Sequence, residues 1–540
     1  MPPAQALSKL DLLLMIDNSR NMLEKQRLLL DALDTLLGQL TGSMAMQDIH
    51  VGAITSSLGS HGSSDVRDVC TKVSDDDHAQ LLGQLRPGLT TWNSSGFLKW
   101  DPAQSATPPG ASTLLALTEE LTTLVNAAGD QGCGYEASFE AWYRFLVDPE
   151  PPLTVARPET SGPAAPQGID ETLLAQRRSF LRPDSVLSIV VLSDENDCSI
   201  VDSGFGWLVT RSTAMSNMYR ATSECATDPN SACCRSCGAG GPTKAGCSDV
   251  ALDPLCSVDK YLTAETDSLN LRCWDQKRRF GLDLLYPISR YVDALTRQTV
   301  PNRAGQAVPN PLFARAGSMR HPSQVVLTGI VGVPWQDLAD EASLTGTGLT
   351  LLGPAELTSA GRWSVMLGDA SATPPVLPKD PFMLETPLDR STLGLPDHPL
   401  VPGARPVAAT STDPEATLNG HEFVNPLNRY LQYACSFRRA EPLTCDQAAR
   451  DAGRSCDCYE ADLAMNSPAC QPPGGGPAVS TQYFDVAAPG LRHLELMRAL
   501  GDAAVPASAC PKVLDQASPD YGYRPAMRAL AARLATALDP

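Results

Sequence analysis

One stretch decides the fold: Leu10-Asp11-Leu12-Leu13-Leu14-Met15-Ile16-Asp17-Asn18-Ser19-Arg20-Asn21. Its apolar run ends in a polar turn, and leucines at helical spacing follow over residues 23–37. An apolar run of this length, bounded by a turn, is typical of a strand buried on both faces of a sheet. The turn offers a carboxylate, a hydroxyl and an amide at alternating positions, which are Asp17, Ser19 and Asn21. Hard divalent cations prefer such oxygen ligands, so the turn predicts a metal site.

The same turn has a simpler interpretation, in which Ser19 or Asn18 caps the following helix by accepting from its free N–H groups. A second stretch favours the metal. Residues 185–197 form another apolar run, and it ends in acids that begin with Asp194. Parallel strands that end side by side place such acids in one crevice, where open α/β sheets bind ligands.

These two stretches resemble the von Willebrand factor A (vWA) fold and its metal-ion-dependent adhesion site. The first motif of the family, Asp-x-Ser-x-Ser, is matched by Asp17 and Ser19, with Asn21 in the third place. Asp194 matches the family's Asp at the end of the later strand. The resemblance implies an α/β fold with a doubly wound, mostly parallel sheet. It also implies that Mg²⁺, or Mn²⁺ or Ca²⁺ in its place, is held by these side chains.

The sequence departs from the family at one further ligand, a Thr that vWA domains supply from a later loop. The corresponding region, residues 129–136, has no Thr, and Glu136 lies there instead. Glu136 is either a substitute carboxylate ligand or an acid that favours the start of the next helix. Both interpretations stay open at this point.

The composition excludes some classes of partner. The chain has 540 residues, and its hydrophobic content of 43% is enough for a large core. With 42 Lys and Arg against 61 Asp and Glu, the formal net charge is −19. Such an acidic protein is a poor match for nucleic acid or an anionic membrane.

The 16 cysteines indicate an oxidising compartment. They fall into four clusters, and Cys234-Arg-Ser-Cys237 is a lone C-x-x-C without a second one at zinc-finger spacing, so we predict disulfides rather than zinc. Each cluster has an odd number of cysteines, so complete pairing requires bridges between clusters. The clusters are residues 70–198, 225–273, 435–470 and Cys510.

No segment reaches the roughly 18 apolar residues that span a bilayer. Met1-Pro2-Pro3 has no basic start of the kind that export signals show. We therefore expect a leader that has been removed or lies upstream, where a lipid anchor would also lie. The expected location is extracytoplasmic, either secreted or on the outer-membrane surface.

Alternating strand and helix patterns favour one doubly wound domain with insertions over a series of domains. We assign the vWA core to residues 1–198, 276–335 and 481–540. A Cys-rich insertion covers 199–275, and a Pro/Gly-rich and Cys-rich insertion covers 336–480. Beyond the two motif strands, we predict strands at 48–56, 98–100, 324–334 and 505–510, and helices at 114–127, 139–147, 171–180, 280–295, 491–500 and 524–538.

The whole layout resembles the large vWA-containing surface lipoproteins of myxobacteria and their relatives. The similarity lies in the Gly-Cys-Gly-aromatic-Glu loop at Cys133 and in the pattern from Phe180 to Ser199. It implies a metal-dependent adhesin of the cell surface or medium, which recognises a protein or matrix ligand whose carboxylate completes the metal coordination. The alternative is a structural scaffold of the bacterial envelope with a degenerate metal site, which Asn21 and the missing Thr favour.

A hydrolase is a third class of function to consider. Ser193 and the seven histidines offer a nucleophile and a base. However, the chain has no Gly-x-Ser-x-Gly elbow and no His-Glu-x-x-His motif. We therefore expect a binding protein rather than an enzyme.

Overall fold

The computed structural model describes most of the chain. The described residues are 7–63, 70, 76–157, 162–211, 217–239, 244–314, 317, 320–369, 372–411, 416–426, 428–451 and 454–538.

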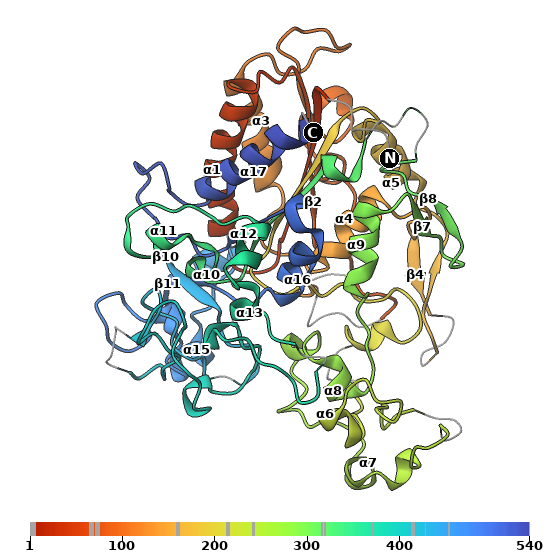
Figure 1. Ribbon diagram of the computed structural model, residues 1–540, viewed down its shortest axis with the longest axis vertical. Coiled ribbons are helices and arrows are strands. Elements are labelled where there is room, and N and C mark those ends of the chain that lie inside the picture. The colour runs from red at the N-terminus through yellow and green to blue at the C-terminus, as the bar shows by residue number, and fades with distance from the viewer. Residues whose placement is uncertain are drawn as a thin grey trace.

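A six-stranded sheet runs through the centre of the molecule (Figure 1). Its strands lie in the order β12-β9-β6-β1-β2-β3. Neighbouring strands are parallel except at one edge, where β3 runs antiparallel to β2. The α/β class and the mostly parallel sheet predicted from the sequence are therefore confirmed. The strands are β1 (Lys9–Ile16), β2 (Asp48–Thr55), β3 (Leu98–Trp100), β6 (Val186–Leu192), β9 (Val325–Val331) and β12 (Ala504–Ser508).

The two motif strands are buried on both faces, as their continuous apolar runs predict. In β1, Leu12 and Leu14 pack into the apolar cluster on one side of the sheet, while Leu13 and Met15 pack into the cluster on the other. This alternation follows from the two-residue period of a strand. All seven residues of β6 are buried.

Helices cover both faces of the sheet (Figure 1). One face packs against α1 (Leu23–Thr41), α3 (Leu114–Asn126) and α17 (Arg524–Leu538). The other packs against α4 (Ser138–Leu146), α5 (Glu171–Phe180), α9 (Ile288–Thr296) and α16 (Leu491–Leu500).

The predicted helix at 280–295 is wrong in its first half. The short helix α8 (Gln276–Phe280) ends there at Gly281, which has a left-handed φ of 69°, and α9 begins only after Pro287. Glycine commonly ends a helix in this conformation, and a proline disfavours helical geometry in the residue before it. Leu284 and Leu285 lie between the two helices and pack into a separate apolar cluster.

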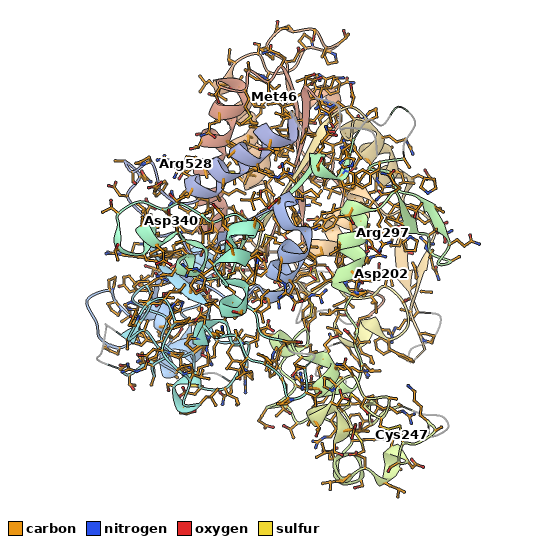
Figure 2. The ribbon with its side chains drawn as sticks, in the orientation of Figure 1. Met46, Asp202, Cys247, Arg297, Asp340 and Arg528 are labelled. Carbon is orange, nitrogen blue, oxygen red and sulfur yellow. A yellow bond between two sulfur atoms is a disulfide. The ribbon has the colours of Figure 1, made fainter. Side chains whose placement is uncertain are left out.

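The two segments predicted from the sequence to be insertions, residues 199–275 and 336–480, have little regular structure in their described parts. Residues 199–275 carry only short helices and lie at the bottom of Figure 1, where Figure 2 labels Cys247. Residues 336–480 include β10 (Cys435–Thr444), which pairs antiparallel with β11 (Thr481–Ala487). The remaining elements are α2 (Leu82–Leu85), α6 (Glu224–Thr227), α7 (Pro254–Val258), α10 (Trp335–Leu338), α11 (Glu341–Thr345), α12 (Pro354–Ser359), α13 (Trp363–Met366), α14 (Gln447–Asp451), α15 (Glu460–Ala464), and the strand pairs β4 (Thr154–Ala156) with β5 (Ala165–Gln167) and β7 (Thr299–Pro301) with β8 (Ala307–Pro309).

Eight disulfides pair all 16 cysteines. Cys198–Cys273 joins the first cluster to the second, and Cys435–Cys510 joins the third to the last. The predicted bridges between clusters are thus confirmed, and the oxidation of every thiol indicates an extracytoplasmic environment. Among the residues that the structure describes, no helix combines the length and apolar content needed to cross a membrane.

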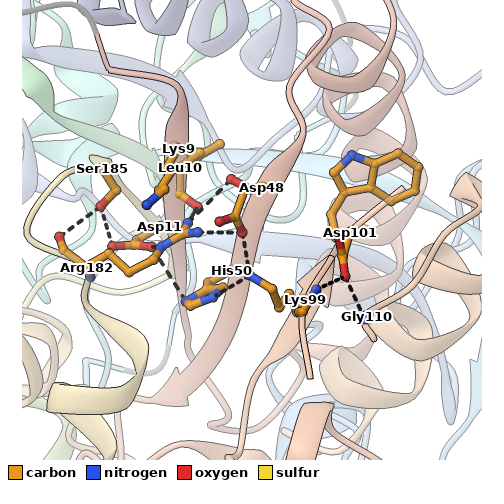
Figure 3. Close-up of polar contacts among 12 residues, drawn as sticks. Lys9, Leu10, Asp11, Asp48, His50, Lys99, Asp101, Gly110, Arg182 and Ser185 are labelled. Atoms are coloured by element: carbon orange, nitrogen blue, oxygen red, sulfur yellow. Dashed lines mark hydrogen bonds and ion pairs between the residues drawn. The ribbon is translucent and has the colours of Figure 1, made fainter. Parts of the chain in front are cut away.

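The charged side chains at the amino ends of β1 and β2 are paired with one another (Figure 3). Arg182 donates through Nε to Asp11 Oδ1 at 2.8 Å and lies 2.6 Å from Asp48 Oδ1 through Nη1. Lys99 Nζ lies 2.5 Å from the same Asp48 oxygen and 3.3 Å from His50 Nε2. The amino ends of these strands are therefore held together by a network of ion pairs.

Candidate functional site

The carboxyl ends of the parallel strands, opposite to this ion network, carry the residues singled out by the sequence. The chain adds β2 and β3 on one side of β1 and places β6, β9 and β12 on the other. The strand order therefore reverses between β1 and β6, which is where open α/β sheets bind ligands. The N–H of Asp17 donates to the Leu192 carbonyl at 2.9 Å. The ends of the two strands, with Asp17 and Asp194 just beyond them, thus lie side by side.

Asp17 is fully buried and held by hydrogen bonds to both carboxylate oxygens. Oδ1 accepts from the N–H of Ser19 at 2.8 Å, and Oδ2 accepts from Ser193 Oγ at 2.8 Å. Burial first, and the nearby charge of Asp194 second, raise the pKa of Asp17 to about 6. Its carboxyl group therefore lies in an environment that lacks enough positive charge.

Among the described residues, Asp194 pairs with one cation, the side chain of Lys25 from α1. Lys25 Nζ lies 2.8 Å from Asp194 Oδ2 and donates to the Asn21 carbonyl at 3.2 Å. The Lys25 side chain is fully buried. Burial lowers the pKa of Lys25, but the charges of Asp194 and Asp485 outweigh it, so its pKa is raised and the ammonium stays charged. A fixed positive charge therefore borders the predicted metal position.

Two glutamates complete the acidic group. Glu136 lies just before α4 with an exposure of only 2%, and burial, followed by the charges of Glu195 and Asp17, raises its pKa well above the usual value. Glu195 has an accessible surface in the cleft, yet its carboxyl group is crowded by surrounding protein. This loss of hydration first, and then the charges of Asp194 and Asp17, raise the pKa of Glu195 to about 8. The pKa values of Asp17, Glu136 and Glu195 are thus all raised.

Asn21 occupies the third place of the turn in a left-handed conformation, with a φ of 69°. Asn tolerates this conformation better than most residues. Its N–H donates to Ser455 Oγ at 2.7 Å, and its side chain hydrogen-bonds to Asp457. Its Oδ1 is buried and accepts no hydrogen bond from any described residue.

The acidic group opens into a cleft of about 740 Å³. Ser19, Glu136, Asp194 and Glu195 line it from the core, and both insertions supply walls. The first insertion contributes a segment that includes Trp274. The second contributes residues that include Glu385, Tyr430, Tyr433 and Asp457, while the exposed Arg20 and Arg429 also line the cleft.

Four of the five residues named from the sequence as metal ligands, Ser19, Asn21, Glu136 and Asp194, line one cleft, and the fifth, Asp17, accepts a hydrogen bond from the N–H of Ser19. The carboxylates of Asp17, Glu136 and Asp194 do not, as a group of three, come within 4.8 Å of one another. Sequence reasoning missed Lys25, Glu195 and Asp457. Glu195 directly follows a predicted ligand and had a local signal. Lys25 resembled an ordinary polar position of a helix, and Asp457 lies hundreds of residues away from the turn.

The arrangement is suited to binding a cation. The pKa values of Asp17, Glu136 and Glu195 are raised by burial and by the charges of neighbouring carboxylates, and the charge of Asp194 contributes to each shift. Lys25 is the described cation that forms an ion pair with Asp194. Ser193, the nucleophile weighed above, is fully buried and donates its hydroxyl to Asp17. It therefore orients a carboxylate in this structure.

Comparison with protein-family models, curated proteins and solved structures finds no match to this chain. What the cleft binds is therefore argued from its own residues.

Proposed function

We propose that this chain is a secreted or cell-surface binding protein of the vWA type, whose cleft takes a divalent cation, Mg²⁺ or, in its place, Mn²⁺ or Ca²⁺. The strand order and the placement of Asp17, Ser19 and Asp194 at the reversal point support the resemblance to vWA domains. Asp17, Ser19, Asn21 and Asp194 would hold the ion directly or through water. Glu136 takes the place of the family's Thr.

One observation carries the proposal: an open cleft ends on carboxylates that the protein itself does not neutralise. Burial and mutual repulsion raise the pKa of Asp17, Glu136 and Glu195 together. A divalent ion would relieve this repulsion and would also use the free Oδ1 of Asn21.

The ligand of the loaded site would be a protein or matrix component. Residues of both insertions line the cleft beside the proposed ion. A carboxylate of the partner would complete the coordination, and aromatic side chains such as Tyr430 and Trp274 would contact the rest of the partner. The insertions would thus select the partner.

The ion pair between Lys25 and Asp194 favours a second candidate, the envelope scaffold with a degenerate site. The ammonium group lies 2.8 Å from a ligand oxygen that the ion would need. In the scaffold, Lys25 takes over part of the role of the ion, and partner binding does not depend on metal.

Calorimetry on the purified, oxidised chain separates the two candidates. We expect Mg²⁺ and Mn²⁺ to bind the wild-type chain and the control Asp34→Asn, whose carboxylate lies exposed on α1. Binding should be lost in Asp17→Asn. If wild-type and Asp17→Asn chains give the same heats, and partner binding persists in a chelator, the scaffold is the correct function.

A further inference from the structure

A second group of ligand atoms lies at the base of the second insertion. Asp337 is in α10, just after β9, while Asp380 precedes the short 3-10 turn Pro381–Met383 and His398 lies in the loop that follows. One ligand atom from each of Asp337, Asp380 and His398 lies within 4.8 Å of the other two. No other group of three or more His, Cys, Asp or Glu in the described residues meets this spacing.

All three side chains are buried, and the atoms that face one another have no partner outside the group among the described residues. Asp337 and Asp380 have no exposed surface, and His398 is 1% exposed. Both carboxylate oxygens of Asp337, Oδ2 of Asp380 and Nε2 of His398 have no hydrogen-bond partner elsewhere among the described residues. Within the group, the two carboxyl groups can share a proton, and Nε2 lies 3.2 Å from Asp337 Oδ1. Buried polar atoms are rarely left this way, because an unmade hydrogen bond is costly. The unpartnered atoms indicate a missing ligand.

The outward atoms of two of these side chains accept backbone hydrogen bonds in the metal-free chain. Asp380 Oδ1 accepts from the N–H of Phe382 at 2.8 Å, and His398 Nδ1 accepts from the N–H of Leu400 at 3.1 Å. His398 Nε2 then lies 3.2 Å from Asp337 Oδ1 and 3.7 Å from Asp380 Oδ2. Two ligands that each lie about 2.0–2.2 Å from one ion are separated by roughly 3–3.5 Å.

We propose that Asp337, Asp380 and His398 bind one divalent transition-metal ion, with Zn²⁺ as the probe. One imidazole and two carboxylates suit Zn²⁺ or Mn²⁺, whereas Mg²⁺ and Ca²⁺ prefer oxygen ligands alone. The two carboxylates also match the charge of a divalent ion, and this attraction offsets the free-energy cost of burying the charges.

Two guanidinium groups lie near the carboxylates, and Arg362 Nη1 and Arg390 Nε have no hydrogen-bond partner among the described residues. Their other nitrogens are bound elsewhere. Arg362 lies 3.0 Å from the exposed Glu341 through Nη2, and Arg390 donates to the carbonyls of Pro381 and Phe382. Without an ion, the carboxyl pair keeps a proton, because burial raises the pKa of Asp337 to about 7 and that of Asp380 well above its usual value. A shared proton is thus the rival occupant of this space.

Loading the site moves two protons. The ion displaces the proton of the carboxyl pair, which leaves to solvent. Because Leu400 donates to Nδ1, the neutral His398 ring carries its proton on Nε2 in the metal-free chain. When the ion takes Nε2, this proton moves to Nδ1 and the Leu400 hydrogen bond is lost.

The role of this ion would be structural. The site is closed to solvent, so no substrate reaches it, and its ligands join the end of β9 to the second insertion. The ion would anchor this insertion, and this inference does not depend on cation binding in the cleft.

The test measures Zn²⁺ retained by the full oxidised chain after chelation, reloading and dialysis. It uses an Asp17→Asn background, so that the cleft does not contribute. We expect about one Zn²⁺ per chain in Asp17→Asn and in Asp17→Asn/Asp397→Asn, a control in the same loop with an exposed carboxylate. Adding Asp380→Asn should weaken binding at least about ten-fold.

X-ray absorption at the zinc edge gives a second measurement that does not require a folded Asp380 variant. We expect one imidazole in the first coordination shell of the loaded Asp17→Asn chain. The inference is overturned if this chain retains no Zn²⁺, if the Zn²⁺ has no imidazole ligand, or if a folded Asp380→Asn variant binds Zn²⁺ as tightly as the control.

Discussion

At the scale of single residues, the amino and carboxyl ends of the central strands differ in how their charged side chains are paired. At the amino edge, Asp48 is paired with both Lys99 and Arg182 (Figure 3). At the carboxyl edge, the ammonium of Lys25 faces Asp194 while Asp17 and Glu195 keep raised pKa values. The first edge is built for stability, and the second has the charge excess that a cation would neutralise.

Replacing the buried ammonium tests this difference. We expect Lys25→Met to lower the free energy of unfolding by about 3–5 kcal/mol in a chelator, because Asp194 then loses its partner. The same variant should bind Mg²⁺ at least about ten-fold more tightly than wild type, because the competing charge is gone. Chemical unfolding and calorimetry measure the two effects.

The control for Lys25→Met is Lys9→Met, which removes a partly exposed partner of Asp184 at 2.6 Å. Pairs of this kind contribute about 0–1 kcal/mol, so little should change. Mg²⁺ affinity in Lys25→Met equal to or below that of wild type would show that Lys25 does not compete with an ion.

His50 gives a prediction for pH dependence. Its Nδ1 lies 2.9 Å from the Phe180 carbonyl, to which it donates, and Lys99 donates to its Nε2. Burial first, and the charge of Arg182 second, lower the pKa of His50 to about 4, even though Asp11 acts in the opposite direction. The neutral ring is therefore the form that the fold accepts.

The unfolded chain binds a proton at His50 below about pH 6.5, whereas the folded chain does so only below about pH 4. The contribution of His50 to stability is therefore lost as the pH falls through this window. In urea unfolding, His50→Asn should remove pH dependence on the order of 3 kcal/mol. The control His78→Asn, at a side chain with 38% exposure, should keep it; an unchanged slope in His50→Asn would refute the assignment.

At the scale of elements, the sequence predicts those structural features that depend on residues close together in the chain. The apolar runs of β1 and β6 predict that both strands are buried. The polar turn after β1 predicts that the cleft lies at the carboxyl ends of the strands. The pairing of β10 with β11 was missed, because 36 residues separate the end of one strand from the start of the other. The helix expected at 280–295 failed because Gly281 and Pro287 override its apolar spacing.

The candidate site follows the same division. Asp17, Ser19, Asn21 and Asp194 follow predicted strands, so the sequence could bring them together. Lys25 points into the site only because α1 packs at this particular angle, and distant segments reach the site only through the folding of the second insertion. No local pattern reports such contacts.

The disulfide Cys435–Cys510 links β10 to the segment after β12 across 75 residues. We expect its removal by paired Cys→Ser changes to lower the free energy of unfolding by about 2–5 kcal/mol, since a long loop in the unfolded chain is no longer closed. Removing Cys233–Cys247, with a separation of 14 residues inside the first insertion, should affect the sheet less. Thermal unfolding followed by circular dichroism compares them, and equal losses would contradict this view.

At the scale of the whole molecule, a core of conventional α/β architecture carries two insertions that meet over one edge of its sheet. Disulfides join each insertion to neighbouring parts of the chain. Residues of both insertions line the 740 Å³ cleft at the carboxyl ends of the strands. The core would supply the cation, and the insertions would supply the surface that recognises a partner. This division explains why irregular segments are tied down so extensively.

The most direct test of this account is a crystal structure of the oxidised chain with Mn²⁺, located by its anomalous scattering. The account predicts an ion at the carboxyl ends of β1 and β6, bound directly or through water to Asp17, Ser19 and Asp194, with Lys25 displaced from Asp194. A cleft without an anomalous peak, and with the Lys25–Asp194 ion pair intact, would contradict it.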